Sequence, residues 1–105
     1  MSRVKFTHKC LGYNDDMDHY EYSCDIYGHI KDHYKCVGYC KYYSIGIEKE
    51  IVYIEFINIS YEHRRRGYAT SMVHELLKKY ILHWDYKFTK DGRKWFESLI
   101  ERKII

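Results

Sequence analysis

A single glycine separates three arginines from an apolar-striped segment in the stretch RRRGYAT, residues 64–70. If a helix begins after Gly67, its first N–H groups have no partner within that helix, and the helix dipole adds a partial positive charge at the same place. Glycine allows the backbone to approach an anion closely, and arginine side chains can add charge at the rim. These residue types at this spacing therefore predict a phosphate-binding turn.

Two other phosphate-binding motifs are excluded. A Walker loop ends in Gly-Lys-Ser or Gly-Lys-Thr, and the sequence contains neither. The dinucleotide fingerprint needs three closely spaced glycines in the first parallel unit, and these are also missing. A solvated charged loop and a nucleic-acid contact stay open as alternatives for the arginines. The net charge of +3 and the lack of a basic stripe elsewhere disfavour nucleic acid.

The elements on either side must position Gly67. The preceding segment, Ile51–Ile59, is largely apolar on both faces, which is typical of a central strand covered on two sides. After Gly67, apolar residues recur at three- and four-residue spacing from Ala69 to Trp84, which predicts an amphipathic helix. A loop between a buried strand and a helix N-terminus is a natural position for an anion.

Three earlier segments alternate with a period of two, which predicts antiparallel strands. They are Val4–Cys10, Tyr20–Gly28 and Tyr34–Tyr43, with the polar turns GYNDDMD and GHIKDH between them and SIGIEKE as the turn before the fourth strand. Near the end, DYKFT (85–89) is predicted to be a short strand. The segment KDGRKWFESLIERKII is predicted to be a second helix, with Asp91 as its N-cap.

The predicted order, β-β-β-β-α-β-α, indicates an α+β protein with a mixed, mostly antiparallel sheet. A strand–helix–strand unit is connected by a right-handed crossover, so the fourth and fifth strands should be parallel. Because the chain has 105 residues and no visible linker, we expect a single domain, residues 1–105.

Composition narrows the class of protein. No apolar run reaches the length of a membrane span, and the first residues lack the apolar core of a signal peptide, so we expect a cytoplasmic protein with reduced cysteines. The cysteines include no Cys-x-x-Cys pair, which favours small buried side chains over a zinc site, and we predict no metal. His19, His29 and His33 fall in predicted turns and are expected to be exposed.

The stretch INISYEHRRRGYATSMVHELLKKY resembles the acetyl-CoA-binding segment of the GNAT superfamily of N-acyltransferases. The family pattern is a hydrophobic strand end, then Arg/Gln-x-x-Gly-x-Gly/Ala at the head of a long helix. The resemblance implies that Ile57, Asn58 and Ile59 lie along the pantetheine arm of acetyl-CoA, and that backbone amides of the loop hold its pyrophosphate. The loop residues are Arg64, Arg65, Arg66, Gly67, Tyr68, Ala69 and Thr70.

The resemblance also implies an N-acetyltransferase, in which a primary amine of a small molecule, a protein lysine or an N-terminus attacks the thioester directly. Glu55 is the candidate base, because it is the only carboxylate in the apolar strand and by alternation shares a face with Tyr53, Ile57 and Ile59. Glu55 and Tyr53 are the candidate catalytic residues, and an exposed position at a sheet edge or a structural ion pair stays open as the alternative for Glu55.

The family's usual acid, a tyrosine in the last helix, is replaced here by Phe96, which cannot donate a proton. Either another group such as one of the tyrosines serves, or the thiolate leaves unassisted, or activity is weak. A non-catalytic acyl-CoA-binding or regulatory module is therefore one alternative, and a small basic nucleic-acid-binding protein is another.

Two departures from the family concern the acceptor site. The segment GYNDDMDH is too short for the helices that the family normally places between its first two strands, and no final pair of strands follows the second predicted helix. We expect an open acceptor cleft, which a second subunit of a homodimer could complete. The acidic stretch NDDMDHYE would attract a cationic amine if it borders that cleft.

Overall fold

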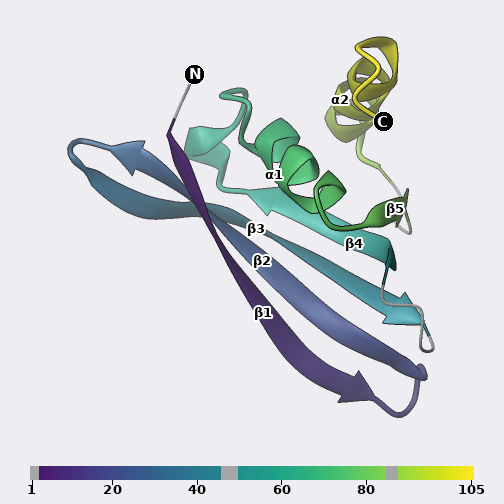
Figure 1. Cartoon of the computed structure of the whole chain (residues 1–105). Coiled ribbons are helices and arrows are strands. Elements are labelled where there is room, and N and C mark those ends of the chain that lie inside the picture. The colour runs from purple at the N-terminus through teal and green to yellow at the C-terminus, as the bar shows by residue number, and fades with distance from the viewer. Residues whose placement is uncertain (1–2, 46–49, 85–87) are drawn as a thin grey trace.

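The computed structural model describes residues 3–45, 50–84 and 88–105. The elements follow the predicted order, with a short 3-10 helix, η1, before the first α-helix (Figure 1). Their bounds are β1 Val4–Asn14, β2 His19–Ile30, β3 His33–Ile45, β4 Ile51–Ile59, η1 Tyr61–His63, α1 Tyr68–Leu77, β5 Ile81–Trp84 and α2 Lys90–Glu101. The α+β prediction is confirmed.

The strands form one sheet in the order β1-β2-β3-β4-β5. The first four are antiparallel neighbours, and β5 is parallel to β4, with α1 as the crossover between them. The first strands are longer than predicted because the turns are tighter. Between β2 and β3 only Lys31 and Asp32 turn the chain, with φ angles of 48° and 69°, as a two-residue hairpin requires.

The core lies between the sheet and α1, which crosses one face of it (Figure 1). Its fully buried side chains come from the middle strands and from the inner stripe of α1: Cys24, Ile26, Val37, Cys40, Val52, Ile54, Met72 and Leu76. Tyr68 fits over Gly28, where a Cβ would lie 2.4 Å from the tyrosine Oη. This contact fixes the first turn of α1 against β2.

Three predicted boundaries were wrong. The helix after Gly67 ends at Leu77 instead of continuing to Trp84, because Ile81–Trp84 pairs with β4 as β5. Phe88 and Thr89 of the predicted DYKFT strand lie in no strand, and its residues 85–87 lie outside the described part of the chain, as do residues 46–49 of the SIGIEKE turn. The N-cap of α2 is Thr89, whose Oγ1 accepts a hydrogen bond from the Gly92 N–H at 3.1 Å.

A β-bulge in β4 corrects the predicted orientation of Glu55. Lys41 pairs with Phe56 and Tyr42 pairs with Ile54, so Glu55 is an extra residue in β4. The bulge reverses the alternation beyond it: Ile59 is buried on the core side, whereas Glu55 lies on the opposite face of the sheet. The expectation that Glu55 shares a face with Ile57 and Ile59 was therefore wrong.

The face opposite α1, called here the open face, carries Glu21, Lys41, Tyr43, Tyr53 and Glu55. All five side chains are only half-buried. The prediction that β4 is covered on both sides therefore holds for its core face alone.

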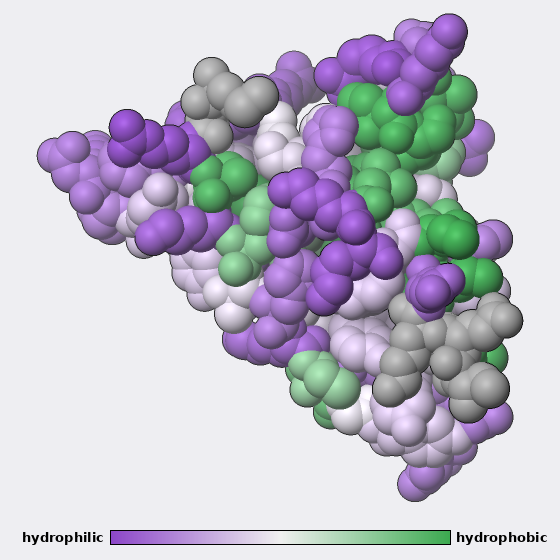
Figure 2. Space-filling view, in the orientation of Figure 1, coloured by the Kyte–Doolittle hydropathy of each residue, from purple (hydrophilic) through white to green (hydrophobic). Residues whose placement is uncertain are grey.

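Figure 2 shows apolar surface over α2, where Ile100 is 51% exposed. No helix in the three described ranges is long and apolar enough to cross a membrane.

Candidate functional site

A cavity of about 720 Å³ opens where β4 and β5 separate, a point called here the fork of the sheet. The two strands pair only from Ile51 to Ile54, opposite Ile81–Trp84, so the second half of β4 runs on without β5 beside it. Residues 56–59 of β4 form one wall of the cavity, the loop and first turn of α1 form a second, and residues between Phe88 and Trp95 form the third. The predicted strand, loop and helix thus meet around one space.

The loop before α1 presents free backbone donors to this cavity. Gly67 is in the left-handed region, with φ of 83°, and α1 begins directly after it, as predicted. The first helical hydrogen bond runs from the Ser71 N–H to the Gly67 carbonyl at 2.9 Å. Within the described part of the chain, no N–H group from Arg65 to Thr70 donates to a backbone carbonyl. Donors without partners and the positive end of a helix dipole are the features that an anion site requires.

Gly67 is needed for its backbone conformation. A Cβ at this position would meet no atom within 4 Å, so the residue faces open space in the cavity and no packing demands its small size. A φ of 83° is costly for any residue with a Cβ. The glycine therefore permits the turn that leads into α1, and it leaves open space on the cavity side of the loop.

The arginines of the loop differ in position. Arg64 donates from Nε to the Ile59 carbonyl at 3.0 Å, which ties the loop to the end of β4. Arg64 and Arg65 line the cavity, whereas Arg66 is not among the described residues that do so. Of the other predicted cofactor-binding residues, Ile57–Ile59 and Gly67–Thr70 all line it. Tyr68 is 5% exposed, so its side chain serves mainly the core.

Eight of the described residues that line the cavity were not predicted as site residues from the sequence, among them His63 and Trp95. His63 is 8% exposed, and neither of its ring nitrogens has a hydrogen-bond partner in the described structure, although it lines the cavity. Such a group is costly to bury unless a ligand or water satisfies it. Trp95 in α2 donates from Nε1 to Thr70 Oγ1 at 3.0 Å, which fastens α2 to the first turn of α1. Trp95 reaches the loop only in the folded chain, whereas His63 directly precedes Arg64 in the sequence.

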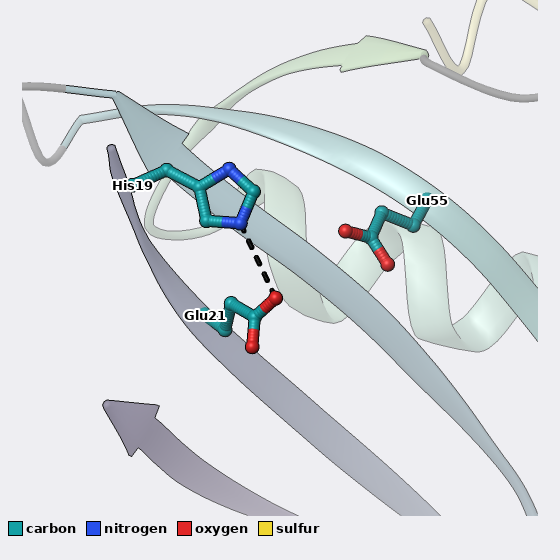
Figure 3. A group of neighbouring side chains, drawn as sticks. All are labelled: His19, Glu21 and Glu55. Atoms are coloured by element: carbon teal, nitrogen blue, oxygen red, sulfur yellow. Dashed lines mark hydrogen bonds and ion pairs between the residues drawn. The ribbon is translucent and has the colours of Figure 1, made fainter. Parts of the chain in front are cut away.

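A polar cluster lies on the open face beside the end of the β4–β5 pairing (Figure 3). His19, Glu21 and Glu55 each place one polar atom within 4.8 Å of the others. His19 is 4% exposed, stacks on Tyr43 with ring centroids 4.4 Å apart, and lies 3.2 Å from Glu21. The prediction that His19 is exposed was wrong. The hydrogen bond from His19 holds the pKa of Glu21 below its usual value.

The ligand types of this cluster are compatible with a metal ion, but a lysine already supplies a cation. Lys41 Nζ lies 3.7 Å from Glu21 Oε1 and 3.6 Å from Glu55 Oε2. We therefore interpret the cluster as an ion-pair network. Its Glu21 comes from the acidic stretch NDDMDHYE, which thus borders Glu55.

Glu55 stands at the fork of the sheet. It is the first β4 residue after Ile54, the last to pair with β5. Tyr53, on the same face, stands between Tyr43 and His83, with ring centroids 5.2 and 5.1 Å away. Among the described residues, the cavity lining includes Phe56 but neither Glu55 nor Tyr53, so neither candidate lies in its wall, and Glu55 directly precedes a wall residue.

A mixed sheet that opens between two parallel strands, with a helix N-terminus facing the opening, is the architecture of an acyltransferase fold. Comparison with protein families matches residues 3–90 to the acetyltransferase (GNAT) family. The chain therefore belongs to this family, which supports acyltransferase function in general. None of the curated proteins compared with the chain matches it.

Proposed function

We propose that the protein is an N-acetyltransferase that moves an acetyl group from acetyl-CoA to a primary amine. The observation that carries the proposal is the run of N–H groups from Arg65 to Thr70, which donate to no backbone carbonyl in the described structure, in a loop and helix turn that line a cavity between diverging strands. The pyrophosphate of acetyl-CoA is the part that these amides suit. Family membership supports the transfer of an acyl group.

The cavity also suits the rest of acetyl-CoA. Its volume of about 720 Å³ is in the usual range of ligand pockets, roughly 300–1,000 Å³. The open edge of β4 at residues 57–59 offers backbone groups to the amides of a pantetheine arm, and Phe88 and Trp95 offer apolar surface. In the described structure the two ring nitrogens of His63 have no hydrogen-bond partner, so they are available to a polar group of a ligand. The binding residues are therefore those of β4, the loop and α2.

The chemistry requires a base for the amine and an acid for the departing thiolate. We assign the base to Glu55, because it follows the last β4 residue paired with β5 and its carboxylate lies on the open face, beside the Lys41 amine. Tyr53, on the same face, is the candidate acid. Phe96 packs against Phe88 and Trp84, with ring centroids 4.7 and 5.0 Å away, so its position supplies an apolar ring and no proton.

The test measures thiol release from acetyl-CoA with a panel of primary amines. Glu55→Gln should lower kcat by about 10²- to 10⁴-fold, the usual contribution of a general base, without changing the Kd for acetyl-CoA. Tyr53→Phe should lower kcat to a smaller extent if the tyrosine donates the proton. Full activity of Glu55→Gln would remove the proposed base.

A non-catalytic acyl-CoA-binding module is the second candidate, favoured by Phe96. Such a module should bind acetyl-CoA while no amine of the panel releases thiol. Turnover that depends on Glu55 would exclude it.

We infer a cytoplasmic location from the cysteines. Cys24 and Cys40 stand opposite each other on β2 and β3, and both are buried free thiols. A reducing compartment preserves such thiols. The protein isolated from cells without reductant should contain no disulfide; an oxidised Cys24–Cys40 pair would contradict the location.

A further inference from the structure

Lys41 places a primary amine beside the proposed base. Its Nζ lies between two carboxylates, 3.6 Å from Glu55 Oε2 and 3.7 Å from Glu21 Oε1, and its side chain is 30% exposed. In the described structure, Lys41 is the only lysine that forms an ion pair with Glu55. An amine that Glu55 deprotonates must lie within hydrogen-bond reach of that carboxylate, and Lys41 is within a small side-chain movement of it.

The backbone also brings Lys41 to the fork of the sheet. In the β3–β4 register, Lys41 is opposite Phe56, the residue that follows the bulge. Phe56 lines the cavity, so Lys41 is one residue pair away from the space assigned to acetyl-CoA. Its flexible four-carbon stem lets the amine move from the carboxylates toward the fork.

We propose that Lys41 is a self-acylation site, modified by the acyl-CoA thioester bound in the same molecule. The inference rests on the proposed function, which supplies the thioester. The Lys41 nitrogen bonds to the acyl carbon, and the carbon–sulfur bond breaks. Of the two protons lost by the ammonium, Glu55 accepts one and the other reaches the thiolate, so the products are N-acyl-Lys41 and free CoA.

The modification changes the charge of the open face. An acylated lysine has no positive charge, so Glu21 and Glu55 lose the cation that lies between them. Glu55 at the fork and Glu21 on β2 then have no counter-charge from Lys41. Self-acylation would thus remove the positive charge of Lys41 from the open face, and the two carboxylates would then favour the binding of an external ammonium group.

Two features of the chain provide matched controls. Lys9 is also ion-paired on the open face, 3.3 Å from Asp25, but it lies in β1 and does not line the cavity. Glu21 holds Lys41 at nearly the same distance as Glu55 does, but it belongs to β2 and lies away from the β4–β5 fork. The acetylation rate of Lys9 therefore measures the uncatalysed reaction. The rate at Lys41 in Glu21→Gln measures the effect of losing one charge partner while Glu55 is intact.

The experiment incubates the full chain with acetyl-CoA and no added amine, and follows acetylation of each lysine by peptide mass spectrometry. Lys41 should react at least about 100-fold faster than Lys9, with a rate constant independent of protein concentration. Glu55→Gln should reduce Lys41 acetylation about 100-fold, whereas Glu21→Gln should retain it. Equal rates at Lys41 and Lys9, or an unchanged rate in Glu55→Gln, would overturn the inference.

Calorimetric titration of the same samples with acetyl-CoA separates this inference from the proposed function. If acetyl-CoA binds and an external amine is acetylated while Lys41 stays unmodified, the self-acylation fails and the proposed function stands. If acetyl-CoA does not bind, both fail together.

Discussion

Replacing Gly67 by alanine tests whether the loop amides bind the ligand. The φ of 83° destabilises the folded state of an alanine variant by about 1–2 kcal/mol. In the opposite direction, alanine has less conformational freedom than glycine in the unfolded chain, which stabilises the folded state by about 0.4–1 kcal/mol. The net loss in the free energy of unfolding is therefore about 1 kcal/mol, since no atom lies within 4 Å of the new Cβ. For a domain of this size, Tm should fall by about 4–8 °C.

The effect on binding should be larger. The new methyl group faces the space where a phosphate would contact the amides, so we expect one charge-assisted hydrogen bond to be lost, worth about 1.5–3 kcal/mol. The Kd for acetyl-CoA should rise about 10- to 100-fold, measured by calorimetry at a temperature where both proteins are folded.

Gly12 in β1 provides the matched control. It has a φ of 112°, and a Cβ added there would meet no atom within 4 Å, but the residue does not line the cavity. Gly12→Ala should therefore lower Tm by a similar amount and leave the Kd unchanged. A wild-type Kd in Gly67→Ala, or equal weakening in Gly12→Ala, would refute the reasoning.

Three further predictions concern the fold. Gly28→Ala would place a Cβ 2.4 Å from Tyr68 Oη and should cost about 1–3 kcal/mol of unfolding free energy in urea titrations; an unchanged midpoint would contradict this packing. Burial raises the pKa of Cys24 to about 12, so an alkylating reagent at neutral pH should label exposed Cys36 and spare Cys24 until the protein unfolds. Burial alone would raise the pKa of Glu75, but the hydrogen bond from a β1 histidine lowers it below the ordinary 4.5. The ionised Glu75 carboxylate therefore stabilises the folded state above the ordinary pKa, and this stabilisation is lost as the pH falls. Glu75→Gln should destabilise the protein near neutral pH and have no such effect in acid.

The loop at Gly67 could be predicted from the sequence because its determinants are local. A glycine supplies the left-handed conformation, and the apolar period changes from strand to helix on either side of it. The α+β class and the order of elements along the chain followed from the same periodicities. The end of α1 could not be predicted in this way, because Tyr80, Ile81 and Trp84 fit the helical stripe. Their conformation is instead set by the pairing of Ile81–Trp84 with β4.

The candidate catalytic face depends on contacts between distant segments. Alternation assigns faces correctly only in a strand without a bulge, and the bulge at Glu55 is visible only in its pairing with β3. His19 and Glu21 reach Glu55 across β3, and Trp95 reaches the loop from the last helix. No spacing in the sequence indicates these distances.

Calorimetric titration of the wild-type protein with acetyl-CoA tests the central claim most directly, especially beside pantetheine, which lacks the phosphates. The loop amides predict binding at one site with a Kd between about 1 µM and 1 mM, and much weaker binding of pantetheine. Absence of acetyl-CoA binding at that upper concentration, or equal affinity for pantetheine, would contradict the claim that the amides from Arg65 to Thr70 hold a pyrophosphate.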